Sequence, residues 1–198
     1  MKGAEVIRAG DAIENPVTGE RLVFRRTSSE TNGEAVLLEC FVQPTGFVAA
    51  AHVHPRQEER FEVLTGRVGF KLDGQEIIAQ AGDRIVVPAG TSHRFWNAGE
   101  EEAHFVCEVR PALQFEQLIE TMFSLAADGK TNRKGMPNPL RLAVIARHHF
   151  DDVRLPFPPA SMQRIGLALG APLGRLFGYR PTYLPTEHEL PEAEIASA

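Results

Sequence analysis

The sequence predicts a mainly β protein in which an antiparallel barrel or sandwich is followed by an α-helical region. Between about residues 20 and 111, short apolar runs alternate at close, regular intervals with turns rich in Gly, Pro, Asn and Asp. That pattern is typical of an antiparallel sandwich or barrel rather than of a parallel sheet. After Pro111 the apolar residues recur at helical spacing instead. We therefore divide the chain into a β domain, residues 1–111, and a helical extension, residues 112–198.

The β region contains a series of short strand patterns. The predicted strands cover residues 21–25, 35–43, 61–64, 67–72, 76–79, 83–87 and 103–109. A turn at residues 31–34 separates the first two strands, and the Asp73-Gly74 step is a strong hairpin signal. Regular turns between short strands are what a closed or sandwiched antiparallel sheet requires.

The second half contains three helical patterns. Apolar residues between 113 and 125 follow helical spacing, and Pro137 and Pro139 precede a second helix at residues 140–147. A third helix is predicted at about residues 161–177, where glycines recur at every fourth position (Gly166, Gly170 and Gly174). This spacing is found in dimers of membrane helices. Because the segment is too short to span a bilayer, close packing on a sheet or a partner subunit is the better interpretation.

Composition excludes several classes of protein. The chain has 198 residues, 43% of them hydrophobic, and a formal net charge of −5 without a Lys/Arg run. Nucleic-acid binding is therefore not expected. The sequence contains no run of about 18 apolar residues, so we expect no membrane-spanning helix. Residues 1–16 do not resemble a signal peptide. Cys40 and Cys107, far apart in an unsecreted chain, are expected to be reduced thiols, so we predict a cytoplasmic protein.

Four side chains form a candidate metal site. His52 and His54 lie two residues apart, so an extended strand directs both imidazoles to one face. Glu59 opens the next strand and brings a carboxylate to the histidines if the hairpin folds over the same interior. His93, after a Pro-Ala-Gly turn, would supply a third imidazole. This mixed N/O set suits one divalent transition-metal ion (Fe, Mn, Ni, Co, Cu or Zn), among which the sequence does not choose.

Two sequence motifs surround these residues. The first is a glycine, five residues, His-x-His, three or four residues, Glu, six residues and a glycine. In this sequence its positions are Gly46, His52, His54, Glu59 and Gly66. The second is a glycine, five residues, Pro-x-Gly, two residues, His, three residues and Asn. Its positions are Gly82, Pro88, Gly90, His93 and Asn97.

With every fixed position filled, residues 20–111 resemble a small single-barrel bacterial member of the cupin superfamily. The resemblance implies a barrel of two small antiparallel sheets that holds a metal ion through His52, His54, Glu59 and His93. Glu58 is the nearest competitor of Glu59, but a neighbour in a strand points to the opposite face. Gly66 and Gly90 are expected in turn conformations that a Cβ would strain, and Asn97 is expected to cap a turn.

Inward positions on the motif strands are candidates for the pocket. We predict that substrate contacts come from Phe61, Phe70, Phe95 and Phe105, with Cys107 beside them, although ordinary barrel core is the competing interpretation of each. His104 alternates with Phe105, so only one of the two sets can face inward. His148 and His149 lie near Asp151 and Asp152. The preferred interpretation of this segment is an exposed helix end, and a second metal site is the alternative.

The resemblance fixes the scaffold better than the reaction. The superfamily includes dioxygenases, isomerases, decarboxylases, lyases and metal-free binding domains. We expect an oxidoreductase of dioxygenase type acting on a small organic substrate, with Glu59 as both ligand and proton acceptor. A metal-dependent isomerase or lyase and a non-catalytic small-molecule-binding protein are the alternatives. The helical extension could cover a sheet, close the barrel mouth or build a dimer interface, and we expect a homodimer.

Overall fold

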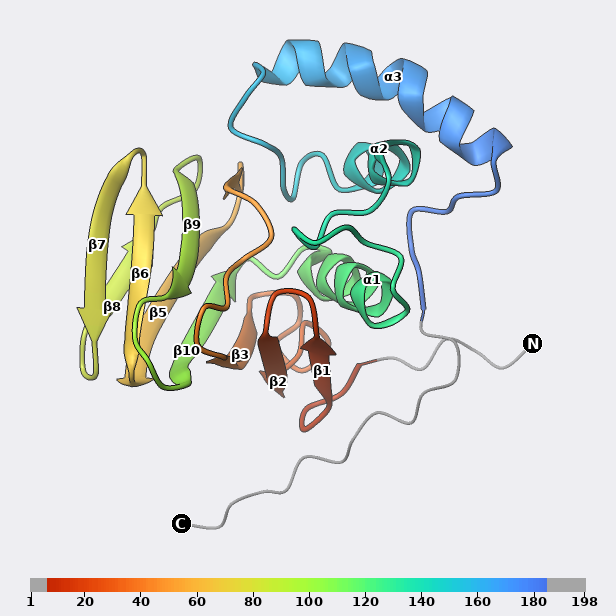
Figure 1. The fold of residues 1–198 in the computed structure, drawn as a ribbon. Coiled ribbons are helices and arrows are strands. Elements are labelled where there is room, and N and C mark those ends of the chain that lie inside the picture. The colour runs from red at the N-terminus through yellow and green to blue at the C-terminus, as the bar shows by residue number, and fades with distance from the viewer. Residues whose placement is uncertain (1–6, 185–198) are drawn as a thin grey trace.

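A computed structural model describes residues 7–184, which form ten strands and three helices. The strands are β1 (Ala12–Asn15), β2 (Glu20–Arg26), β3 (Val36–Val42), β4 (His52–Val53), β5 (Glu58–Thr65), β6 (Arg67–Leu72), β7 (Gln75–Gln80), β8 (Arg84–Val87), β9 (Ser92–Asn97) and β10 (Ala103–Arg110). The helices are α1 (Phe115–Ala127), α2 (Pro139–His148) and α3 (Ala160–Leu176). The predicted mainly β fold with helices at its C-terminal side is confirmed (Figure 1).

The strands form two antiparallel sheets. The six-stranded sheet has the order β1-β2-β3-β10-β5-β8, and the four-stranded sheet has the order β4-β9-β6-β7. Strand β3 alternates strictly between buried and half-buried residues, and β10 does the same. Their register places Leu38 opposite Cys107, which in turn lies opposite Phe61 of β5. One face of the larger sheet therefore supplies rows of side chains to the core, as alternation along a strand requires.

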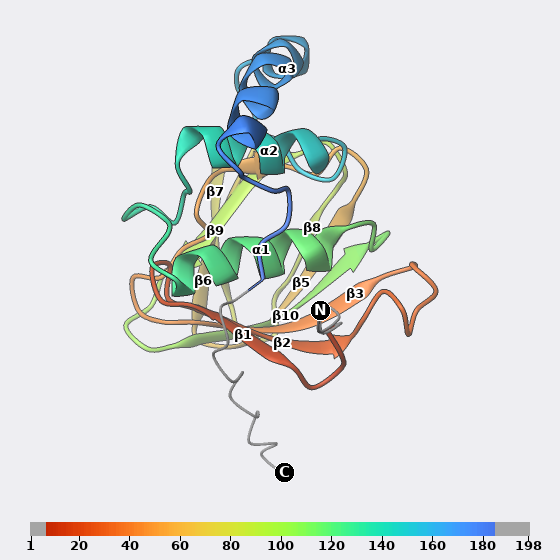
Figure 2. The ribbon, with the colours of Figure 1, turned by 90° about the vertical axis from the view of Figure 1, so that its right-hand side faces the viewer.

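The helices lie on the β1–β2 side of the molecule. Helix α1 packs against β1, and α2 packs against α3. Figure 2 shows α1, α2 and α3 one above another over β1 and β2. A Cβ on Gly174 of α3 would lie 2.5 Å from the carbonyl oxygen of Leu140, and one on Gly170 would lie 3.1 Å from Ala143. These two glycines therefore permit the close packing that their spacing predicts, but the partner is α2 of the same chain rather than a sheet or a partner subunit.

The predicted elements differ from the structure mainly at short strands. Strand β1, four residues long, was not expected, because it is too short to show an alternating pattern. Gly66 and Gly90 adopt positive φ angles of 76° and 87°, as predicted. The side chain of Asn97 donates to the carbonyls of Val42 and Glu101 and so stabilises a turn. The division into domains 1–111 and 112–198 stays a prediction, although the last strand ends at Arg110 and the first helix begins at Phe115.

None of the helices between residues 7 and 184 has the length and apolar character needed to cross a membrane.

Candidate metal centre

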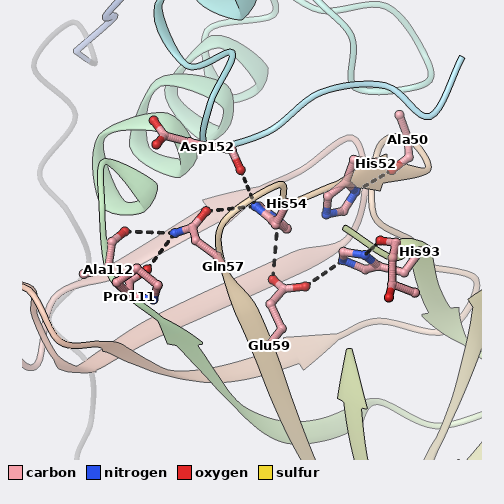
Figure 3. Close-up of polar contacts among 10 residues, drawn as sticks. Ala50, His52, His54, Gln57, Glu59, His93, Pro111, Ala112 and Asp152 are labelled. Atoms are coloured by element: carbon pink, nitrogen blue, oxygen red, sulfur yellow. Dashed lines mark hydrogen bonds and ion pairs between the residues drawn. The ribbon is translucent and has the colours of Figure 1, made fainter. Parts of the chain in front are cut away.

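Three strands and one turn bring the four predicted ligands together. His52 of β4 lies directly opposite His93 of β9 in the smaller sheet. His54 directly follows β4, and Glu59 enters from β5 of the larger sheet. One potential ligand atom of each side chain lies within 4.8 Å of those of the other three (Figure 3). The site therefore lies where the two sheets meet, and both motifs contribute to it.

The Glu59 carboxylate lies between two of the imidazoles. Its Oε2 atom is 2.6 Å from Nε2 of His93, and its Oε1 atom is 3.7 Å from Nε2 of His54. Oε2 is fully buried and has no well-formed hydrogen bond within residues 7–184, although it lies close to Nε2 of His93. A buried carboxylate oxygen without a well-formed partner is costly. A cation among the four side chains would remove that cost, so the residues present fit a metal ion.

The Nδ1 atom of each histidine is held from outside the site. Nδ1 of His52 lies 2.8 Å from the carbonyl oxygen of Ala50, that of His54 lies 2.7 Å from that of Asp152, and that of His93 lies 3.1 Å from that of Thr91. A carbonyl accepts only, so each Nδ1 carries a proton, which leaves Nε2 as the ring atom that can bind a metal ion. This outer arrangement is the one that orients histidine ligands in metalloproteins.

Gln57 and Asp152 complete the surroundings of His54. The Gln57 Oε1 atom lies 3.0 Å from Nδ1 of His54, while its Nε2 group donates to the carbonyls of Pro111 and Ala112. Sequence reasoning placed Gln57 only in a turn and missed this role. Its position between His54 and Glu59 was the one available signal. The contact of His54 with the Asp152 carbonyl links residues 98 positions apart, which no local pattern reveals.

The charge states of the site suit cation binding. Burial, together with the neighbouring His54 and His93, lowers the pKa of His52 to about 3, so this imidazole is neutral at physiological pH. Burial alone would raise the pKa of Glu59, but the three histidines outweigh it and hold this pKa at about 2. Burial opposes protonation of His93, whereas the adjacent Glu59 carboxylate raises its pKa above the ordinary value. A cation would compete directly with that proton.

A cavity of about 490 Å³ adjoins three of the four side chains, those of His52, His54 and Glu59. It reaches from the barrel interior to the helical region, and residues of α1, α2 and α3 form part of its wall. Of the predicted pocket residues, Phe61, Phe95 and Phe105 line it, with Cys107 beside them. Three roles were predicted for the helical region, and one of them, closure of the barrel mouth, agrees with this cavity.

Phe70 is not among the residues that line the cavity. Its fully buried ring packs against those of Phe61 and Phe95, at centroid distances of 5.1 and 6.4 Å. Its role as a substrate contact stays a prediction. Alternation along β6 correctly indicates that Phe70 points inward. It does not indicate how deep in the barrel the side chain lies.

Two of the open alternatives are settled by burial. Glu58 contacts Arg60 at the surface, whereas Glu59 is 5% exposed and faces the site. His104 points away from the cavity, and on that outer face it contacts Glu39 and stacks on Phe41. Phe105 and Cys107 are therefore the inward set.

The expected exposed helix end at residues 148–152 is wrong for His149. This side chain is fully buried, and its Nδ1 atom lies 3.2 Å from Oδ2 of Asp152, although His148 is exposed. Among residues 7–184, no cluster of three potential metal ligands forms around His149. Both cysteines are free and buried, and both border the cavity.

Residues 38–109 match the model of the cupin domain family. Among curated proteins, a polyketide synthase CurC from Streptomyces cyaneus is 38% identical over 60 residues, which are 30% of this chain and 39% of that protein. A probable oxidoreductase virH from Hypocrea virens is 29% identical over 148 residues, covering 67% of this chain and 64% of that protein. The chain thus spans less than two thirds of the length of either relative.

Similar solved structures include a predicted oxalate decarboxylase from Thermotoga maritima. It is 21% identical, with a TM-score of 0.47, and the match covers 54% of this chain and 99% of that one. The family match extends over both motifs from β3 to β10, and the two antiparallel sheets enclose the four motif side chains. Residues 38–109, which carry both motifs, therefore form a cupin domain.

Proposed function

We propose that His52, His54, Glu59 and His93 bind one divalent transition-metal ion, and that the protein is an oxidoreductase of dioxygenase type. The observation that carries the proposal is the arrangement of the three imidazoles. Each Nδ1 faces a backbone carbonyl, which leaves Nε2 as the ring atom that can bind a metal ion beside the buried Glu59 carboxylate. Two relatives whose names are probable oxidoreductase virH and oxidoreductase iacF agree with this class of reaction.

The chain's own residues prepare the site for a small organic substrate. A bound Fe, Mn, Ni, Co or Cu ion would supply redox chemistry and open positions for dioxygen or a chelating substrate. Each histidine that binds the ion through Nε2 would do so without adding charge. Glu59 is a proton acceptor for an acidic group of the substrate if one of its oxygens leaves the metal. The phenylalanines of the wall exclude water from the cavity, which strengthens electrostatic interactions inside it.

The cavity favours an aromatic or otherwise largely apolar substrate. Phe61, Phe95 and Phe105 are the proposed contacts, and most of the remaining wall is aliphatic. A substrate with a carbon chain and regularly spaced oxygen atoms, as in a polyketide, would combine an apolar body with a metal-chelating group. The polyketide synthase name of one relative agrees with that chemistry.

Metal content is the first test. Untagged protein purified without chelator is analysed by elemental mass spectrometry beside the double variant His52→Ala/His54→Ala. We expect about one Fe, Mn, Ni, Co or Cu per chain in the native protein and loss of that metal in the variant. Absence of metal after reconstitution, or equal metal in both proteins, would contradict the proposed ligands.

Oxygen consumption tests the reaction class. Metal-loaded protein is screened with aromatic compounds and 1,3-diketones in an oxygen electrode, and products formed under ¹⁸O₂ are analysed by mass spectrometry. Incorporation of both oxygen atoms into product is the expected result. Turnover without oxygen, sustained by Zn(II), would instead identify Lewis-acid isomerase or lyase chemistry. Tight binding without turnover under either atmosphere would identify a non-catalytic binding protein.

We also propose a cytoplasmic homodimer. The two free, buried cysteines suit a reducing compartment. Helix α3 supports the dimer, because it leaves a row of large apolar side chains exposed. They are Met162, Ile165, Leu169, Leu173 and Leu176.

A further inference from the structure

The cavity beside the metal centre has a second polar location. Glu20, the first residue of β2, and Asn15, the last residue of β1, both line this cavity. Glu20 is 7% exposed and Asn15 is 4% exposed. The neighbouring wall is formed by Leu22, Leu38 and Cys40. Two buried polar side chains beside this apolar part of the wall require an explanation, since unpaired polar groups destabilise a fold.

The local turn uses only part of their hydrogen-bonding capacity. Oδ1 of Asn15 accepts from the backbone N–H groups of Val17 and Thr18 at 3.1 and 3.2 Å. Oε2 of Glu20 accepts from the Thr18 hydroxyl at 2.6 Å. Oε1 of Glu20 and Nδ2 of Asn15 make no hydrogen bond within residues 7–184. Neither atom is among the fully enclosed polar atoms that lack a partner. Both atoms therefore border open space in the cavity.

Glu20 is suited to neutral hydrogen-bonding groups rather than to cations. Its carboxyl group forms no ion pair with any residue between positions 7 and 184. Burial raises the pKa of Glu20 to about 7, although the hydrogen bond from Thr18 lowers it. A carboxyl group that keeps its proton near neutral pH both donates and accepts hydrogen bonds. Together with the Asn15 amide, it offers a donor and an acceptor to a hydroxyl or carbonyl group.

The register of the larger sheet separates this location from the metal centre. Glu20 lies opposite Val42 of β3, whereas Glu59 lies opposite Val109, which lies opposite Val36 of β3. Val36 and Val42 are six residues apart, on the order of 20 Å along the strand. The wall between them is apolar, with Cys40 beside Phe105 and Leu38 beside Cys107. One cavity thus has a polar group near each end and an apolar middle.

We propose that Glu20 and Asn15 form a subsite for a neutral hydroxyl or carbonyl group at the far end of an elongated, largely apolar ligand. The other end of that ligand carries the oxygen atoms that reach the metal centre. This inference rests on the proposed metal-dependent function and deepens it, because it specifies a substrate that is polar at both ends. Compact chelators would leave the Glu20 subsite empty.

Matched probes of increasing length test this subsite. Zn(II)-loaded protein, in which dioxygen is not activated, is titrated calorimetrically with linear 1,3-diketones whose alkyl tails end in either a methyl or a hydroxyl group. At one tail length we expect the hydroxyl-ended probe to bind about 5- to 10-fold more tightly than the methyl-ended probe, the effect of one neutral hydrogen bond. At shorter lengths the two probes should bind equally.

Variants at Glu20 assign the effect to this residue. Glu20→Leu should abolish the hydroxyl advantage, so that the hydroxyl-ended probe no longer binds more tightly than the methyl-ended probe at any length, whereas Glu20→Gln should preserve the advantage. Glu14→Gln, which removes an exposed carboxylate from β1, is the matched control and should behave as the native protein. Glu20→Gln also keeps the proposal testable if Glu20→Leu fails to fold.

The outcomes separate this inference from the proposed function. Equal binding of both probe series to native protein at every length overturns the subsite and leaves the metal centre standing. An undiminished hydroxyl advantage in Glu20→Leu also overturns it. If neither series binds to protein with a full complement of Zn(II), both the subsite and the proposed substrate-chelating function are overturned.

Discussion

Gln57 lies one contact away from the proposed metal and fixes the ring of a ligand. Gln57→Leu removes the acceptor beside Nδ1 of His54 and leaves the carbonyls of Pro111 and Ala112 without their donor. Since outer partners of this kind orient a ligand and tune its basicity, we expect metal affinity to fall about 10- to 100-fold. Competition with a chromogenic chelator at fixed pH measures the change.

The neighbouring residue Glu58 provides the control for this prediction. Its side chain faces solvent and contacts Arg60, so Glu58→Gln should leave metal affinity unchanged. If Gln57→Leu and Glu58→Gln retain the same affinity, the Asp152 carbonyl alone suffices to orient His54.

The burial of Glu20 predicts a pH dependence of stability. Its pKa is raised in the folded state from 4.5 to about 7. The stabilising contribution of this group to the free energy of unfolding is therefore complete below pH 4.5. That contribution is lost as pH rises through about 7, where the buried carboxyl group must ionise. By linkage, the loss amounts to at most about 3 kcal/mol. Glu20→Gln carries no charge, so the variant should gain stability relative to the native protein at alkaline pH.

Chemical denaturation of both proteins across the acidic to alkaline range measures this difference. Exposed Glu14→Gln should show no such trend. A pH-independent difference between Glu20→Gln and the native protein would show that Glu20 titrates with its ordinary pKa in the fold.

Individual residues were predictable where they follow a strict period. His52 and His54 lie two apart on extended chain, and Glu59 is distinguished from Glu58 by strand alternation, so sequence spacing predicted which side chains converge. Alternation does not give depth along the barrel, so it predicted that Phe70 points inward but not whether this side chain reaches the cavity. The hydrogen bonds of Gln57 depend on carbonyls 54 and 55 residues away, and local spacing does not reveal such partners.

At the scale of elements, the glycines of α3 distinguish packing from open surface. A Cβ on Gly174 would lie 2.5 Å from the Leu140 carbonyl oxygen and 2.7 Å from Cγ2 of Val144, whereas one on Gly166 would meet no atom within 4 Å. Gly174→Ala should therefore force α3 away from α2 and cost about 1–3 kcal/mol of unfolding free energy. Gly166→Ala should be neutral or stabilise by up to about 1 kcal/mol, as alanine does inside a helix.

Denaturant titration of the two alanine variants gives the comparison directly. Equal stabilities would mean that α3 does not pack on α2 through Gly174. The spacing of the glycines predicted close packing, but it did not predict that α2 is the partner. That choice depends on the loop between α2 and α3, whose course has no sequence period. Strand β1 escaped prediction for a similar reason, although its Asn15 lines the cavity.

At the scale of the molecule, the helical region is part of the site. Val53 and Arg154 exchange two backbone hydrogen bonds, and the Asp152 carbonyl accepts from His54. Sequence reasoning left three roles open for these helices, because contacts between residues about 100 positions apart have no local signature. The β region alone therefore supplies the four ligands, but the helical region supplies part of the hydrogen bonding that orients them.

Exposed apolar side chains on α3 give a prediction about assembly. Leu169 is 75% exposed and Ile165 is 65% exposed, one turn apart on the same face. If α3 packs on the α3 of a second copy in a two-fold symmetric contact, Ile165 and Leu169 of both copies become buried. We therefore expect a dimer in sedimentation analysis, and we expect Leu169→Glu to raise its dissociation constant by at least about 100-fold, since each copy loses roughly 2 kcal/mol of apolar burial.

The control places a charge on the opposite side of the molecule. Ile78 of β7 is 46% exposed and lies in the smaller sheet, away from the helices (Figure 1). Ile78→Glu should leave the dimer intact, and neither variant should lose metal, because both positions lie outside the site. Dissociation by Ile78→Glu alone would assign the contact to the smaller sheet. A native protein that stays monomeric at high concentration would refute the homodimer and leave the α3 face without a partner of its own kind.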